Sequence, residues 1–156
     1  SPKETGKTFM SNSKLKVKFF SKFANYPVIS DDSGLCIKAL RNKPGIQSAR
    51  FAKEKGGFFS AMKFILKKIK NKKVKSAIFV CNLSYKSPGG KIVTVEGKVH
   101  GKISDKILGK KGFGYDPIFV PNGKKITYGQ MSKLKKIKID HRYIAFKKLK
   151  KIIKTL

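Results

Sequence analysis

Carboxylates are scarce in this 156-residue chain, so the positions of the few present are informative. Lys and Arg total 38 against 8 Asp and Glu, a formal net charge of +30. Two of the eight acids are adjacent, Asp31 and Asp32, and Ser33 and Gly34 follow them. Neighbouring carboxylates point in different directions, so one can bind Mg²⁺ while the other orients or deprotonates a water. Ser33 and Gly34 would allow a phosphate to approach; the structural alternative is an Asp-rich turn.

A second candidate is the glycine-rich segment 109–119, which contains Phe113 between two glycines and Asp116 shortly after. Such a loop can place an aromatic ring on a planar ligand, and the carboxylate can accept hydrogen bonds from ring N–H groups. The segment is not a P-loop, because no Gly-Lys followed by Ser or Thr closes it. The structural alternative is a turn before a strand, with Phe113 in the core.

A third candidate is Asp140-His141-Arg142, at the start of the last predicted helix. Helix N-termini attract anions, and the side chains of His141 and Arg142 could donate hydrogen bonds to a purine. A single histidine is nevertheless more often structural than catalytic. The chain has no Cys/His cluster with zinc spacing and no serine-nucleophile motif.

Hydrophobic periodicity predicts the elements that must position these residues. Apolar residues at helical spacing predict three helices: 8–25, 58–69 and 141–153. Short apolar or alternating stretches predict five strands: 26–30, 35–40, 76–85, 91–103 and 118–120. The Pro-Gly-Gly link at 88–90 makes the third and fourth strands a hairpin. We expect an α/β fold, a mixed β-sheet flanked by helices, in a single domain over residues 1–156 with a β-hairpin lobe.

Composition limits the classes of protein. No apolar run approaches the roughly 18 residues of a membrane span, and the first ten residues lack the apolar region of a signal peptide. Cys36 and Cys81 form neither a disulfide framework nor a Cys-x-x-Cys pair, which fits a reducing, cytoplasmic location. The charge of +30 suggests a nucleic-acid-binding protein, but 35 of the 38 basic residues are Lys and only 3 are Arg. Because Arg is the usual residue for paired contacts to bases and phosphates, specific nucleic-acid binding is not expected.

Several segments carry, in order, motifs of one known family. They are 4–9, Asn12 with Lys16, 27–35, 44–52, 112–119, Met131-Ser132, Lys136 and His141-Arg142. This chain resembles the ITP/XTP pyrophosphatases, also called inosine triphosphatase-like proteins, over nearly its whole length. The resemblance implies a Mg²⁺-dependent hydrolase that converts ITP, dITP or XTP to the monophosphate and pyrophosphate, and so removes damaged nucleotides. It also implies the fold of that family and a homodimer.

The resemblance also assigns residues. Asp32 matches the general base, Glu4, Asp31 and Asp32 match carboxylates around the metal, and Lys16 and Ser33 match phosphate contacts. The residues that match the purine pocket are Phe113, Gly114, Tyr115, Asp116, Lys136, His141 and Arg142. Bonding to a 6-oxo group would favour inosine or xanthine, because an amino group there would leave buried donors unpaired.

The sequence departs from the family pattern at its beginning. Family members begin with a strand and a phosphate-binding segment with Asn and Lys, and this sequence has no equivalent of either before Glu4. We therefore expect an N-terminally incomplete version of the domain. Two alternatives to the enzyme stay open: a relative that binds nucleotide without cleaving it, and a basic nucleic-acid-binding protein.

Overall fold

A five-stranded β-sheet in the order β2-β1-β3-β4-β5 organises the chain in the computed structural model, which describes residues 2–155. The strands are β1 (Val28–Ile37), β2 (Lys43–Pro44), β3 (Ser76–Lys86), β4 (Val93–Ile103) and β5 (Phe119–Pro121). The helices are α1 (Phe9–Phe20), α2 (Ser48–Glu54), α3 (Phe58–Ile69), α4 (Lys133–Lys136) and α5 (His141–Ile153). Strands β1 and β2 pair antiparallel, as do β4 and β5. The expected α/β fold is confirmed.

The contacts divide the chain into two compact units. The first contains residues 2–33, 80–98 and 141–155, and the second contains 34–79 and 99–140. Strands β1, β3 and β4 contribute residues to both units.

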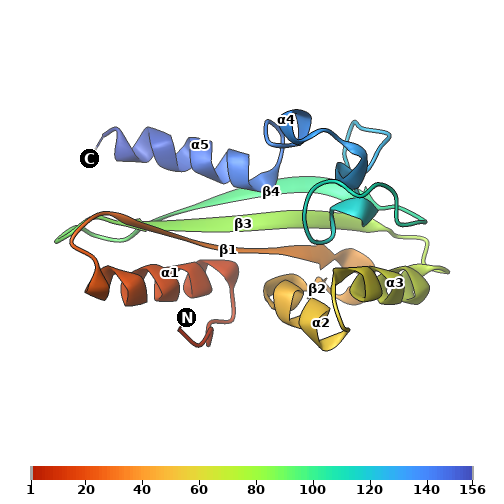
Figure 1. Ribbon diagram of the computed structural model, residues 1–156, viewed down its shortest axis with the longest axis horizontal. Coiled ribbons are helices and arrows are strands. Elements are labelled where there is room, and N and C mark those ends of the chain that lie inside the picture. Colours follow the sequence, from red (N-terminus) through yellow and green to blue (C-terminus); the bar gives the residue numbers. More distant parts are fainter. Residues whose placement is uncertain (1, 156) are drawn as a thin grey trace. The chain divides into compact units, whose positions relative to one another are not determined.

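In the first unit, α1 and α5 cover opposite faces of the strands (Figure 1). The alternation of side chains along β3 explains this arrangement, since successive residues point to opposite faces. Cys81 and Leu83 join an apolar cluster with Leu149 of α5. Ser84 points the other way, and its hydroxyl lies 2.8 Å from the Ser13 hydroxyl of α1. One face of this unit is therefore apolar and the other is buried but polar.

The second unit holds the larger apolar core. Helix α3 buries Met62, Ile65 and Ile69, which pack with Phe79 and Phe119 and other apolar residues. The Phe79 and Phe119 rings meet edge to face at 4.6 Å, a favourable aromatic geometry. The predicted bounds of α3 and α5 match the structure.

The acidic motif lies inside a strand, which corrects one prediction. The sequence predicted two strands, 26–30 and 35–40, separated by a turn, whereas β1 runs unbroken through Val28–Ile37. The polar residues on one face of β1 are tolerated because helix α1 supplies partners: the Ser30 hydroxyl donates to the Ser13 carbonyl at 2.6 Å. Asp31 and Asp32 are therefore neighbours on a strand and must point to opposite faces.

Candidate active site

The beginning of α1 positions the first group of candidate residues, all in the first unit. Thr8 caps the helix by accepting a hydrogen bond from the Ser11 amide at 3.0 Å, and Ser11 reciprocates toward Thr8. One turn later the buried Asn12 accepts the Gly6 amide at 2.8 Å, which holds the preceding segment against the helix. Lys16 lies four residues after Asn12, so both side chains leave the same face of α1.

Lys16 joins two carboxylates. Its ammonium lies 3.0 Å from Glu4 Oε1 and 3.0 Å from Asp32 Oδ1. Burial lowers the pKa of Lys16, but its hydrogen bonds to Glu4 and Asp32 together outweigh burial and leave that pKa above 10.5. Lys16 therefore stays charged and fixes the two carboxylates close to one another.

Asp32 combines burial with one unused oxygen. Burial is the largest influence on its pKa and raises it above 3.8, although the Lys16 ammonium and the Asn12 side chain pull it down. Its Oδ2 is buried and has no hydrogen-bond partner. A buried polar atom without a partner is unusual and costs free energy unless a ligand supplies the partner. Asp32 Oδ2 is thus available to a water proton or a cation.

Asp31 is on the other face of β1, with different partners. Its Oδ2 accepts the Ser33 hydroxyl at 2.7 Å and the Arg142 Nε at 3.2 Å. The structure therefore brings Ser33 and Arg142 to Asp31, and it does not bring Asp31 to the Glu4–Asp32 pair. The reason is the side-chain alternation of a strand, which the predicted turn had hidden.

The second unit contains another lysine–carboxylate group. The deeply buried Asp116 accepts the Phe113 amide at 2.6 Å and the Lys136 ammonium at 2.7 Å on its Oδ2. Burial raises the pKa of Asp116 above 3.8 despite Lys136. Gly112 makes this possible, because its φ of +79° suits glycine and a Cβ there would collide with the Asp116 carboxylate.

A pocket of about 560 Å³ opens beside this group, within the range typical of ligand sites. Phe113 is 67% exposed and lines it, together with Lys136, Met131 and Ile137. The Phe58 ring supports Phe113 edge to face at 5.3 Å. The predicted stacking loop therefore presents its aromatic ring to a cavity, and the alternative of a core position for Phe113 is wrong.

Other predicted residues lie deeper. Tyr115 is buried, and its hydroxyl donates to the Ser48 carbonyl at 2.8 Å, so it supports the loop instead of facing the pocket. Gly114 has a φ of +63°, which residues with a side chain rarely adopt. His141 is buried at the start of α5 in the first unit.

Two supporting residues were not singled out from the sequence. Phe58 braces Phe113, but its position in an apolar helix stripe gave no sign of this. Ser48 belongs to the family-like segment 44–52, and its hydroxyl accepts the Leu35 amide at 2.9 Å and donates to the Gly45 carbonyl at 2.7 Å. That segment therefore contributes structure in the second unit.

Comparison with known proteins gives the family. The Ham1 family model matches residues 1–152, and the chain belongs to this family. A dITP/XTP pyrophosphatase of Bacillus subtilis is 40% identical over 154 residues, covering 97% of this chain and 78% of that protein. One from Borreliella burgdorferi is 44% identical over 160 residues, covering 97% and 79%. The Ham1 protein structure of Staphylococcus aureus superposes with a TM-score of 0.93 at 39% identity, covering 99% of this chain and 81% of that one.

Metal-binding capacity rests on oxygen ligands. Across residues 2–155 no three His, Cys, Asp or Glu side chains gather in a way that could hold an ion. Mg²⁺, however, is commonly bound by one or two carboxylates together with water and substrate phosphates. Glu4 and the unpartnered Asp32 oxygen fit such a site. In the same described range, no helix has the length and apolar character needed to cross a bilayer.

Proposed function

We propose that this chain hydrolyses ITP, dITP and XTP to the nucleoside monophosphate and pyrophosphate. The observation that carries the proposal is Asp32, a buried carboxylate with one oxygen on Lys16 and the other without a partner. The relatives named dITP/XTP pyrophosphatases supply the substrate class.

Asp32 is the proposed general base. Its Oδ2 removes a proton from a water, and the water oxygen attacks the α-phosphorus. The bond from the α-phosphorus to the bridging oxygen breaks, and pyrophosphate leaves with the electron pair. A pKa above the usual aspartate value makes Asp32 a stronger base.

Lys16 and Glu4 are the other residues of the first unit that we propose act on the phosphates. Lys16 holds Asp32 in one orientation and supplies positive charge near the phosphates. Glu4 would hold Mg²⁺ together with the substrate phosphates, and the bound ion would neutralise phosphate charge while Asp32 Oδ2 stays open to the water. Arg142 is held by Asp31 through its Nε, which leaves the rest of its guanidinium for substrate.

We propose that the Phe113 pocket of the second unit binds the purine. The exposed Phe113 ring stacks on the purine, and Lys136 donates a hydrogen bond to a 6-oxo group. The amino group of adenine would give Lys136 no acceptor at position 6, so ATP is disfavoured. Tyr115 and Asp116 position Phe113 and Lys136, and His141 stays a predicted contact to the purine edge.

We also propose a cytoplasmic homodimer. Support for the dimer comes from an aromatic cluster in the first unit. The Phe19 ring centroid lies 5.3 Å from that of Phe20 and 5.4 Å from that of Phe23. Phe23 and the following Tyr26 are largely exposed, an unusual surface for a monomer. Light scattering of the wild type and of Phe23→Lys tests this, with the variant expected to be monomeric; a wild-type monomer would contradict it.

The experiment that tests the function is pyrophosphate release with Mg²⁺ from ITP, dITP, XTP, GTP and ATP. Release from the first three and little from ATP supports the proposal. Thermal stabilisation by ITP without release would instead indicate a nucleotide-binding relative without turnover. Oligonucleotide binding that survives 0.2 M salt, with no release, would favour the nucleic-acid alternative.

A further inference from the structure

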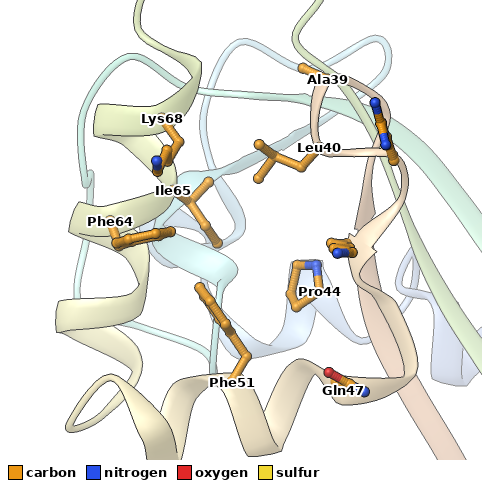
Figure 2. Close-up of a pocket in the computed structure, with 10 residues that line it drawn as sticks. Ala39, Leu40, Pro44, Gln47, Phe51, Phe64, Ile65 and Lys68 are labelled. Carbon is orange, nitrogen blue, oxygen red and sulfur yellow. The ribbon is translucent and has the colours of Figure 1, made fainter.

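A second pocket, of about 320 Å³, lies in the second unit between α2, α3, strand β2 and the turn before it. Figure 2 shows that Leu40, Pro44, Phe51, Phe64 and Ile65 converge on it from these elements. Its volume is near the lower end of small-molecule sites. The pocket is thus an apolar chamber large enough for a ring system.

The charged residues at this pocket are all of one sign. Arg41, Lys43 and Lys68 line it and are exposed, whereas no carboxylate lines it. None of the three forms an ion pair with any residue in the part of the chain that the structure describes. Lys68 also lies over the Phe64 ring, with its ammonium 5.5 Å from the ring centroid. An apolar chamber with three cations that form no ion pair among the described residues complements an anion with an apolar body.

Arg41 is unusual in this chain in two ways: its residue type is rare, and its backbone φ is positive. Arginine occurs 3 times against 35 lysines, so its presence at a pocket is not explained by the lysine bias. Arg41 and Asn42 both have left-handed backbones, with φ of 54° and 61°. Asn tolerates this conformation, whereas a long side chain such as that of Arg41 rarely adopts it, and such outliers are concentrated at functional sites. The turn is held by hydrogen bonds from the Arg41 amide to Lys38 and from the Asn42 amide to Ile37.

We propose that this pocket binds a small organic anion: a flat apolar ring system that bears one carboxylate, sulfonate or similar group. The ring occupies the chamber beside Phe51, Phe64 and Ile65. The anionic group is bound by Arg41, whose planar guanidinium can donate two parallel hydrogen bonds, with Lys68 as a second cation. This site uses none of the residues assigned to pyrophosphate release.

The probe pair is 1-anilinonaphthalene-8-sulfonate and its neutral analogue N-phenyl-1-naphthylamine, titrated by fluorescence into the purified full chain at 0.15 M salt. The expected result is saturable binding of one sulfonate probe per chain at this site. We expect the neutral analogue to bind at least about tenfold more weakly, because a charge-assisted hydrogen bond contributes that much or more.

Three variants locate the site. Arg41→Gln should weaken sulfonate binding about tenfold, and Ala39→Phe should remove it by filling the chamber without changing the charge. Lys67→Gln changes the charge on the same helix as Lys68, outside the lining, and should leave affinity within about twofold. Circular dichroism verifies folding, and pyrophosphate release by each variant checks independently that the proposed enzyme is intact.

Several results would overturn the proposal. Equal affinity for the neutral analogue would show that the pocket does not recognise the anionic group. Equal weakening by Arg41→Gln and Lys67→Gln would mean general attraction to a +30 surface. Binding that Ala39→Phe leaves unchanged would place the probe elsewhere, and absence of saturable binding to the wild type would end the idea. None of these outcomes depends on nucleotide hydrolysis.

Discussion

The two units each contain a buried aspartate paired with a lysine, yet the two pairs differ in what they leave unsatisfied. In the second unit, Asp116 Oδ2 receives both the Phe113 amide and the Lys136 ammonium. In the first unit, Asp32 binds Lys16 through one oxygen, and the other is buried without a partner. Burial raises the pKa of both acids. The comparison teaches that burial with a cation is not enough to mark a reactive carboxylate; of these two aspartates, Asp32 is the one with a fully buried oxygen that has no hydrogen-bond partner.

The largest expected effect separates the two aspartates directly. Asp32→Asn should reduce kcat/KM for ITP by about 10²–10⁴-fold, the usual contribution of a general base. It should not lower the melting temperature, since it removes a buried charge that folding disfavours. Pyrophosphate release and thermal denaturation measure the two. The matched control is Asp105→Asn, whose side chain is 81% exposed, and comparable losses in both variants would refute the special role of Asp32.

The pH dependence tests the raised pKa of Asp32. Because the base must be ionised, kcat/KM should fall about tenfold per pH unit below a pKa that lies above 3.8. Lys16→Met should move this limb to higher pH, as it removes the cation that lowers the Asp32 pKa.

The raised pKa of Asp32 also makes the stability of the fold depend on pH. Above pH 3.8 and up to the raised pKa, the folded protein holds more protons on Asp32 than the unfolded chain does. The Asp32 contribution to stability therefore decreases as pH rises through that window. If the acid side of the kcat/KM pH profile did not move in Lys16→Met, the proposed effect of Lys16 on the Asp32 pKa would be contradicted.

Lysine removal should then rank the two pairs by stability. Lys136→Met leaves the deeply buried Asp116 without its cation and should destabilise the fold by about 3 kcal/mol, or roughly 6–12 °C in Tm. Lys16→Met should cost less, because its site is more open and the substitution also relieves the cation's own burial. Parallel thermal scans at pH 7 measure both, and the reverse order would invert the comparison between the units.

The pocket beside Asp116 should respond in binding. Phe113→Ala should raise the KM for ITP about tenfold with little change in kcat, because a base stacked on an aromatic ring gains about 1–3 kcal/mol. Since Phe113 is 67% exposed, Tm should hardly change. Phe59→Ala removes a similarly exposed ring, at 62%, that does not line the pocket. If both variants show the same kinetics, Phe113 does not stack on the substrate.

The sequence predicted elements well where the hydrophobic period was regular. Helices α3 and α5 and the strands β3 and β4 have apolar residues at fixed spacing, and their predicted bounds agree with the structure to within two residues. The short α2 and α4 were missed because four to seven residues carry too little periodicity. Strand β1 was divided in two because Asp31, Asp32 and Ser33 resemble a turn. The two carboxylates are tolerated in a strand because distant residues pair with them, Arg142 with Asp31 and Lys16 with Asp32.

The candidate site was predicted by residue more successfully than by arrangement. The motifs identified Glu4, Lys16 and Asp32, and the structure brings them together. They also grouped Asp31 with these, although it pairs with Arg142. Nothing in a list of motifs reports the face to which a side chain points, and that depends on the conformation of the backbone.

The smallest expected effect concerns this disputed carboxylate. Asp31→Asn removes a partly exposed ion pair to Arg142, and such pairs contribute at most about 1 kcal/mol to stability. It should leave the Mg²⁺ concentration for half-maximal activity unchanged and raise the nucleotide KM only about two- to threefold, through a less well oriented Arg142. Glu4→Gln makes the same acid-to-amide change beside Asp32 and should raise the Mg²⁺ requirement at least tenfold. Mg²⁺ titration of both variants shows which carboxylate binds the metal. The two carboxylates have equal charge, but Glu4 lies on the Asp32 side of β1 and Asp31 points to the other face. An equal rise in the Mg²⁺ requirement for both would return Asp31 to the metal and would mean that both faces of β1 take part in the same chemistry.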